Sequence, residues 1–229
     1  MTTIKPSKST TIKPTKEYFG PFLPSFREHV HKLVHWGYED ALDKIQHPKN
    51  NQDKEETSIT GFLAEAIEDQ LDAFNPDDWC KCYSVYDDRA VNTDGRSGKY
   101  RSRADLVIKS NSEGGPQYVF EAKRLKKHKH TESDYTGSNG MGRFISGKYA
   151  IRYNEAGMLG YVQSNGLAEW KDRVIRRIDQ DAEELNLING SQRDKQVINA
   201  FPIEWMSKHN RNSLRPITLY HILLDCCVE

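Results

Sequence analysis

Three ionisable side chains lie on two neighbouring segments where they could carry out hydrolytic chemistry together. Asp105 precedes the apolar run LVI, and Glu121 follows the apolar run YVF, with Lys123 two residues later. The letters NSEGGP between the runs are typical of a turn, because glycine reaches positive φ at little cost and proline presets φ. The two segments therefore predict a β-hairpin that brings Asp105 close to Glu121.

Two converging carboxylates repel each other unless a cation or a proton lies between them. Magnesium prefers oxygen ligands, commonly one or two carboxylates with waters and a substrate phosphate, and the backbone carbonyl of Ala122 can add a ligand. Alternate residues of a strand share a face, so Lys123 lies on the same side as Glu121. An ammonium there can orient a water or meet developing phosphate charge. A metal ion, paired acids and a lysine are the parts needed for phosphodiester hydrolysis.

The spacing of these residues resembles a known family. Asp105, followed sixteen residues later by Glu121-Ala122-Lys123, is similar to the motif of the PD-(D/E)xK superfamily, the restriction-endonuclease-like nucleases. Ala104 stands where the motif nominally has proline, a position that varies widely in that superfamily. The resemblance covers residues 55 to about 163, roughly half of the chain. It implies an α/β fold of the restriction-endonuclease-like kind, a mixed β-sheet flanked by helices in an α/β/α sandwich.

The resemblance also implies roles for individual residues. Asp105 and Glu121 would hold Mg²⁺ together with the carbonyl of Ala122, and Mn²⁺ would substitute for Mg²⁺. Lys123 would position or activate the attacking water.

The superfamily often places one more glutamate on the helix before the sheet. Glu56, in the stretch EETSITGFLAEAIE, is the residue expected in that catalytic and metal-binding role. Glu55 and Glu65 remain alternatives.

Positive charge accumulates directly after this motif. Lys126, Lys127 and Lys129 follow it with no acid among them, and they are expected to bind the backbone of a nucleic acid. The alternative is a solvated surface, the usual role of a charge run. Arg143, in GMGRF, is expected at the start of the following helix, within reach of a phosphate.

The spacing of apolar residues, with a helical period in some segments and strand-like runs in others, predicts further elements. Helices are expected in the ranges 25–34, 38–46, 57–72, 141–156 and 165–188. Strands are expected in the ranges 79–86, 103–109, 117–123 and 158–163, with two more between 197 and 227. Ser207, His209 and His221 lie on the last two strands, either as satisfied structural groups or as supports of the site.

Composition sets the remaining limits. The chain of 229 residues has a net charge of zero, so no global nucleic-acid signature is present. No apolar stretch is long enough to span a membrane, and no secretory signal is recognisable. We therefore expect a cytoplasmic location. Residues 1–17 are expected to be a disordered basic tail, and residues 18–229 a single nuclease-like domain.

The expected function is a magnesium-dependent endonuclease that hydrolyses DNA. An effector of restriction or anti-phage defence, acting with a protein partner or as a homo-oligomer, fits this expectation. The alternative is a catalytically silent adaptor or structural subunit of a nucleic-acid-associated complex. Divalent-ion binding that depends on Asp105 distinguishes the two.

Overall fold

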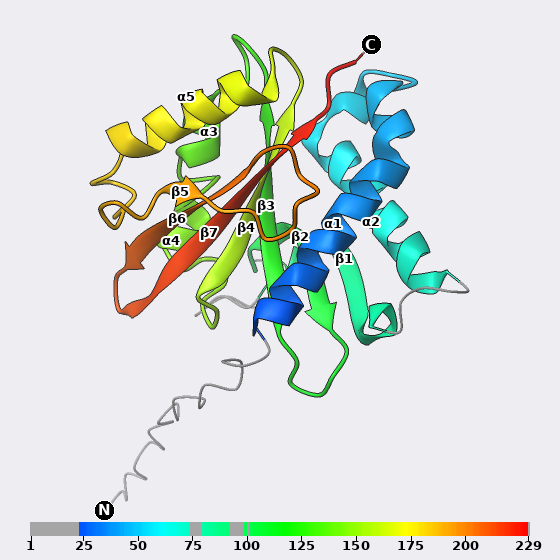
Figure 1. Cartoon of the computed structure of the whole chain (residues 1–229), viewed down its shortest axis with the longest axis horizontal. Coiled ribbons are helices and arrows are strands. Elements are labelled where there is room, and N and C mark those ends of the chain that lie inside the picture. Colours follow the sequence, from blue (N-terminus) through cyan, green and yellow to red (C-terminus); the bar gives the residue numbers. More distant parts are fainter. Residues whose placement is uncertain (1–22, 74–78, 92–98, 100, 229) are drawn as a thin grey trace, which may run out of the picture.

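The central feature is one mixed sheet, seen in a computed structural model that describes residues 23–73, 79–91, 99 and 101–228 (Figure 1). The strands are β1 Tyr83–Ala90, β2 Arg103–Ser110, β3 Gln117–Leu125, β4 Glu155–Val162, β5 Arg193–Asp194, β6 Glu204–Arg211 and β7 Leu214–Asp225. These seven strands are arranged in the order β1-β2-β3-β4-β7-β6-β5. The expected mixed sheet is therefore present, while the expected tail lies outside the described residues.

Strand direction determines which ends of the strands meet. β2 pairs antiparallel with β1 and with β3, whereas β4 runs parallel to both β3 and β7. β6 pairs antiparallel with β7 and with β5. The carboxyl ends of β3, β4 and β7 consequently lie at one edge of the sheet.

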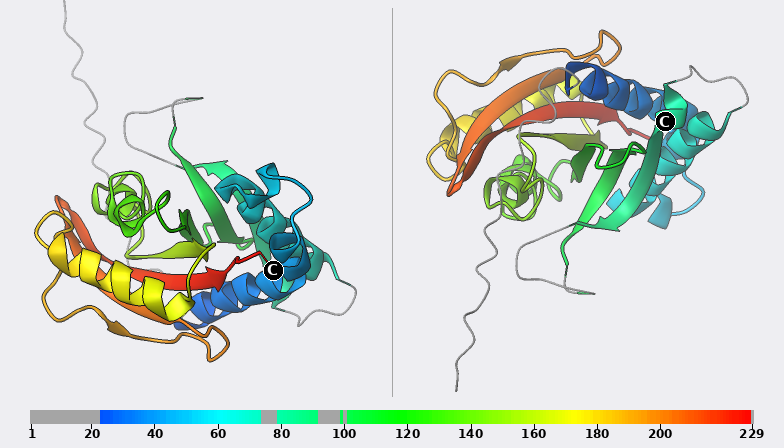
Figure 2. Two further views of the ribbon diagram at one scale, coloured as in Figure 1. Left: turned by 90° about the horizontal axis from the view of Figure 1, so that it is seen from above. Right: turned by 90° about the horizontal axis from the view of Figure 1, so that it is seen from below.

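Helices cover both faces of this sheet and form two apolar cores. The helices are α1 Leu23–Gln46, α2 Glu56–Asp72, α3 Glu132–Thr136, α4 Gly142–Ile145 and α5 Leu167–Gln180, with short 3₁₀ helices η1 Gln52–Lys54 and η2 Cys80–Cys82. Residues of α1 and α2 belong to the first core, and residues of α3, α4 and α5 belong to the second. Figure 2 shows α1 and the α3–α4 segment on opposite sides of the sheet.

β3 passes between the two cores, and its sequence reflects this. Tyr118 and Phe120 are buried in the first core, while Val119 and Leu125 are buried in the second. A strand buried on both faces normally reads as a continuous apolar run. Glu121 interrupts that run inside the protein, where an unpaired charge is costly, so its surroundings must compensate for it.

α1 corrects the prediction of two short helices over 25–34 and 38–46, because one helix runs through Gly37. A Cβ atom at Gly37 would collide with the side chain of Ile67 on α2. The glycine is therefore needed for the close approach of α1 to α2, which outweighs its low helix propensity.

The helix expected over 141–156 is also wrong. α4 has only four residues, and the end of the expected range already belongs to β4. Left-handed backbone at Gly147 (φ +74°) and Ala150 (φ +49°) ends helical geometry there.

α5 corrects the range 165–188, since it ends at Gln180. Leu185 nevertheless packs in the second core from the following turns, which explains why the apolar stripe misled the prediction. The helix expected over 57–72 is confirmed, with its start one residue earlier, at Glu56.

In the described part of the chain, no helix is long and apolar enough to cross a membrane.

Candidate active site

The hairpin predicted from the sequence is present and positions the two acids. β2 and β3 pair from Lys109–Gln117 to Leu106–Phe120. Beyond that last pair, the backbone N–H of Ala122 donates to Oδ2 of Asp105 over 2.7 Å. Where the backbone pairing of the strands stops, the side-chain carboxylate of Asp105 thus replaces a backbone acceptor. This hydrogen bond holds Asp105 against β3.

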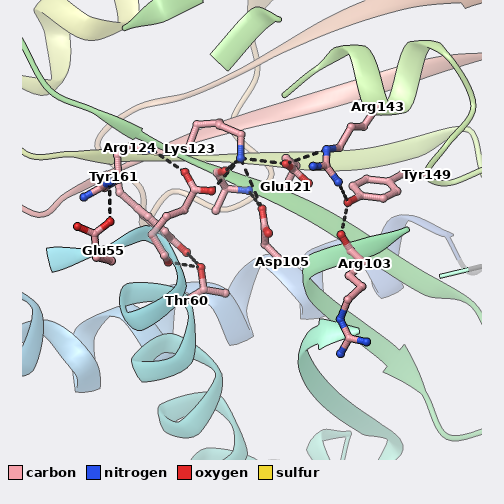
Figure 3. Close-up of polar contacts among 12 residues, drawn as sticks. Glu55, Thr60, Arg103, Asp105, Glu121, Lys123, Arg124, Arg143, Tyr149 and Tyr161 are labelled. Atoms are coloured by element: carbon pink, nitrogen blue, oxygen red, sulfur yellow. Dashed lines mark hydrogen bonds and ion pairs between the residues drawn. The ribbon is translucent and has the colours of Figure 1, made fainter. Parts of the chain in front are cut away.

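Four oxygen atoms surround the ammonium of Lys123 (Figure 3). Its Nζ atom lies 2.8 Å from Glu56 Oε1, 2.9 Å from Glu121 Oε1 and 3.9 Å from Asp105 Oδ2. It also donates a hydrogen bond to the carbonyl of Ala122. The residues predicted from the sequence therefore converge on one point.

Burial dominates the electrostatics of the acids. Only 1% of the Glu121 side chain is exposed, and burial, with the charge of Asp105, raises the pKa of Glu121 to about 8 despite Lys123. Burial likewise raises the pKa of Asp105, partly offset by Lys123 and the Ala122 N–H. A further cation nearby would lower the pKa of both carboxyls and stabilise their ionised forms.

The pKa of Lys123 limits what this side chain can do. Burial would lower that pKa, but the charges of Glu121, Glu56 and Asp105 outweigh burial and raise it. A catalytic base works best with a pKa near the working pH. In this arrangement Lys123 is therefore a charged donor and not a proton acceptor.

Glu56, not Glu55 or Glu65, is the helix glutamate that reaches the site. Its second oxygen, Oε2, accepts the backbone N–H of Arg124 over 3.1 Å. Glu55 pairs outside the site with Arg124 at 2.7 Å. Glu65 is 65% exposed and pairs with Lys44 on α1.

Arg143 lies beside Glu121, where its positive charge is already engaged. Its Nε atom is 3.3 Å from Glu121 Oε1, and its guanidinium donates to the hydroxyl of Tyr149, which donates to the carbonyl of Arg103. Tyr149 was missed from the sequence, because nothing in its local pattern marks it as a neighbour of Glu121. The expected position of Arg143 at the start of the helix after the hairpin is confirmed, while its reach to a phosphate stays a prediction, because the group it contacts here is an acid of the protein itself.

The donor atoms around Lys123 match the chemical preference of Mg²⁺. Three carboxylates and a carbonyl are hard oxygen ligands of the type that Mg²⁺ prefers. Glu121 Oε2 is buried and has no hydrogen-bond partner among the described residues. Against this, no group of three or more His, Cys, Asp or Glu side chains in the described ranges is arranged to hold a metal. The donor chemistry fits, but Lys123 occupies the centre, so it would have to move aside.

A cavity of about 320 Å³ opens on this cluster. Glu56 and Lys123 line it from one side, and His130 and the polar residues around Asn139 line it from the other. Asp105 and Glu121 are not among its lining residues. A substrate in the cavity would therefore meet Glu56 and Lys123 first.

The basic run lies at the end of β3. Lys126, Lys127 and Lys129 are all exposed, and none forms an ion pair with a residue that the structure describes. Their charges are available to a ligand, which agrees with both the nucleic-acid role and the solvated surface.

A second buried polar cluster lies on β6 and β7. The hydroxyl of Ser207 is 2.7 Å from His209 Nε2 and 2.8 Å from His221 Nε2. His221 Nδ1 is 3.1 Å from the hydroxyl of Tyr135, and His209 Nδ1 is 2.8 Å from the carbonyl of Leu185. These residues contact none of the acids around Lys123, so the prediction of satisfied structural groups is the one that agrees with their placement.

The chain was compared with protein-family models, with curated proteins and with solved structures, and none of the three comparisons finds a match.

Proposed function

We propose that the protein is a magnesium-dependent nuclease of the PD-(D/E)xK kind that hydrolyses phosphodiester bonds of DNA. The observation that carries this proposal is the convergence of Asp105, Glu121 and Glu56 on Lys123, with one buried oxygen of Glu121 left unpaired. Buried carboxyls at this density stay ionised only if a cation compensates them, and raised pKa values of this kind are typical of functional sites.

Asp105, Glu121, Glu56 and the carbonyl of Ala122 are the groups that would hold Mg²⁺, or Mn²⁺ in its place. The ion would supply Lewis-acid polarisation of the phosphate and a more acidic bound water. Lys123 would orient the water and stabilise negative charge on the phosphate through its ammonium. Arg143 would remain a positive neighbour of Glu121, with the guanidinium nitrogens beyond Nε available to a phosphate oxygen.

Wider aspects of the proposal rest on the resemblance of the motif. A restriction-endonuclease-like fold, a role in restriction or antiviral defence, and a cytoplasmic location belong to it. A protein partner or self-association would supply the DNA specificity for which no separate recognition domain is evident in the sequence.

One observation favours the alternative of a catalytically silent adaptor. Lys123 already neutralises the acids from within the chain, an arrangement that can be purely structural. A wild-type protein that neither binds divalent ions nor cleaves DNA would support that alternative.

The test uses the purified chain with plasmid, linear duplex DNA, single-stranded DNA and RNA. Cleavage of DNA is expected with Mg²⁺ or Mn²⁺ and not in EDTA, and Ca²⁺ should bind without supporting turnover. Thermal unfolding should shift upward with Mg²⁺ in the wild type but not in Asp105→Ala. Cleavage that continues unchanged in EDTA would exclude the metal mechanism.

A further inference from the structure

A second cavity lies at the edge of the sheet where β3, β4 and β7 end. Its volume is about 360 Å³, and it is lined by Lys54, Lys126, Gln163, Ser164, Cys227 and Val228. The crevice outside the carboxyl ends of parallel strands is a frequent ligand position in open α/β sheets. The location alone therefore makes this cavity a candidate for binding.

Hydrogen bonds hold the walls of this cavity in place. The side-chain amide of Gln163 donates to the carbonyl of Lys54 over 2.7 Å, which ties η1 to the end of β4. The backbone N–H of Lys127 donates to Ser164 Oγ over 2.8 Å, which ties the end of β3 to the same segment. The cavity is thus formed by groups whose positions are fixed before any ligand arrives.

The lining carries positive charge and hydrogen-bond donors. Lys54 and Lys126 form no ion pair with any residue that the structure describes, and no acid of the described ranges lines the cavity. Ser164 accepts a bond from Lys127 and retains its own hydroxyl proton as a donor. Burial, with Asp225 nearby, raises the pKa of the Cys227 thiol to about 11, so it adds no negative charge. Two ammonium groups and a hydroxyl suit a phosphate.

We infer that this cavity binds a backbone phosphate of the DNA strand whose neighbouring phosphodiester is presented to Lys123. This inference rests on the proposed nuclease function. Lys54 precedes Glu56 by two residues and Lys126 follows Lys123 by three, so the same two chain segments build the cavity and the acid cluster. A strand following this edge of the sheet would engage both, and the cavity would set the register of cleavage.

The test measures DNA binding without chemistry, in EDTA, over a range of salt concentrations. In the double variant Lys54→Ala/Lys126→Ala, affinity for duplex DNA should fall about tenfold or more, and the magnitude of the slope of log K against log salt should decrease by about one, because one phosphate contact is lost. Lys208→Ala is the matched control, because Lys208 is exposed on β6 and lines neither cavity. Unchanged affinity and slope in the double variant would overturn the inference.

Additional arms separate this inference from the proposed function and from other phosphate sources. If the wild type does not cleave DNA but the double variant loses salt slope, the phosphate site stands and the nuclease proposal fails. Inorganic phosphate should compete with DNA only weakly, and the competition should disappear in the double variant. The strand-binding role would be contradicted if inorganic phosphate bound tightly and the double variant abolished that binding without a change in DNA affinity. It would also be contradicted if the Lys208→Ala control lost as much DNA affinity and salt slope as the double variant.

Discussion

The cluster around Lys123 and the cluster around Ser207 are both buried and polar, yet they differ in charge and completeness. The first contains three carboxylates around one ammonium, and it leaves Glu121 Oε2 without a hydrogen-bond partner among the described residues. It also opens on a cavity. Burial of a charged, incompletely paired group costs stability, and sites of this kind are where function is most often found.

The cluster around Ser207 is neutral and complete. If Tyr135 donates to His221 Nδ1, then His221 Nε2–H donates to Ser207, Ser207 donates to His209 Nε2, and His209 Nδ1–H donates to the carbonyl of Leu185. Each donor and each acceptor in this chain is used once. Burial lowers the pKa of His209 to about 4 and that of His221 well below its usual value, which keeps both rings neutral. The indole N–H of Trp205, which stacks on His221, has no hydrogen-bond partner among the described residues, but Ser207 and the two histidines are fully paired. Such complete pairing of buried polar groups is typical of a structural feature.

Asp105→Ala should produce the largest effect, since it removes a carboxylate from the proposed metal site and the acceptor of the Ala122 N–H. DNA cleavage should fall about 10³-fold, the upper range for removal of one electrostatic group from an active site. The measurement is the rate of plasmid nicking in Mg²⁺, with circular dichroism to verify folding. Asp105→Asn is the matched variant that retains the hydrogen-bond acceptor, and normal cleavage by it would contradict the metal role.

Lys123→Met should lower the cleavage rate about 100-fold, because it removes the ammonium but keeps most of the buried side-chain volume. The carboxylates of Glu56 and Asp105 then lack their cation, and Glu121 loses a hydrogen-bond donor, so stability in EDTA should fall by about 3 kcal/mol, as for other broken buried ion pairs. Urea denaturation with and without Mg²⁺ measures this. Mg²⁺ should stabilise this variant more than the wild type, and an equal Mg²⁺ effect in both proteins would show that the ammonium and the ion do not share a site.

Ser207→Ala should lower the free energy of unfolding by about 2 kcal/mol, because it leaves two buried imidazole nitrogens without a partner. Cleavage per folded molecule and the response to Mg²⁺ should stay at wild-type values. Parallel urea denaturation and nicking assays measure both properties. A selective loss of cleavage in a stable Ser207→Ala protein would place this cluster in the catalytic machinery. The cluster around Ser207 would then not be purely structural.

The smallest effect concerns pH, and its sign differs between the two clusters. Unfolded histidine binds a proton near pH 6.5, whereas folded His209 and His221 do not, so their contribution to stability decreases as pH falls; between pH 7 and pH 6 the loss is about 0.7 kcal/mol for each histidine. Folded Glu121, with its pKa raised to about 8, binds a proton that the unfolded carboxyl releases. Its contribution therefore increases as pH falls.

The contributions of Glu121 and of the two histidines to the pH dependence of stability can be measured separately in EDTA, where no divalent ion binds. Glu121→Gln removes the opposing acid, so its stability should decrease more steeply from pH 7 to pH 6 than that of the wild type. Urea midpoints at the two pH values measure this difference. Identical pH dependence in the two proteins would mean that Glu121 is ionised in the folded state at neutral pH.

Much of the site could be predicted because its signals are local. Asp105, Glu121 and Lys123 are marked by the strand runs and the turn between them, and the strand period places two of them on one face. Glu56 could be proposed only with Glu55 and Glu65 as alternatives, because a choice among neighbouring helix residues depends on how α2 docks on β3.

The errors share a physical cause, namely tertiary contacts that override local preference. Gly37 lies in the gap between the two helices predicted over 25–34 and 38–46, although it is a point of close packing between α1 and α2 within one continuous helix. The range 141–156 was interpreted as a helix, although left-handed residues divide it. Tyr149 joins the site through contacts with Arg143 and Arg103 that no spacing in the sequence reveals.

The contact between Glu56 and Lys123 spans 67 residues of sequence, and it makes assembly of the acid cluster dependent on the long-range docking of α2. A chain that is still emerging during synthesis has the helix glutamate before it has the hairpin acids, whereas a chain that has opened locally between α2 and β3 retains the hairpin acids but lacks the contact with the helix glutamate. Contacts of such high sequence separation form late, because loop closure precedes any gain from them. If the protein is the proposed nuclease, an unfinished or damaged copy lacks part of the acid cluster, so quality control of the fold would also be control of the activity.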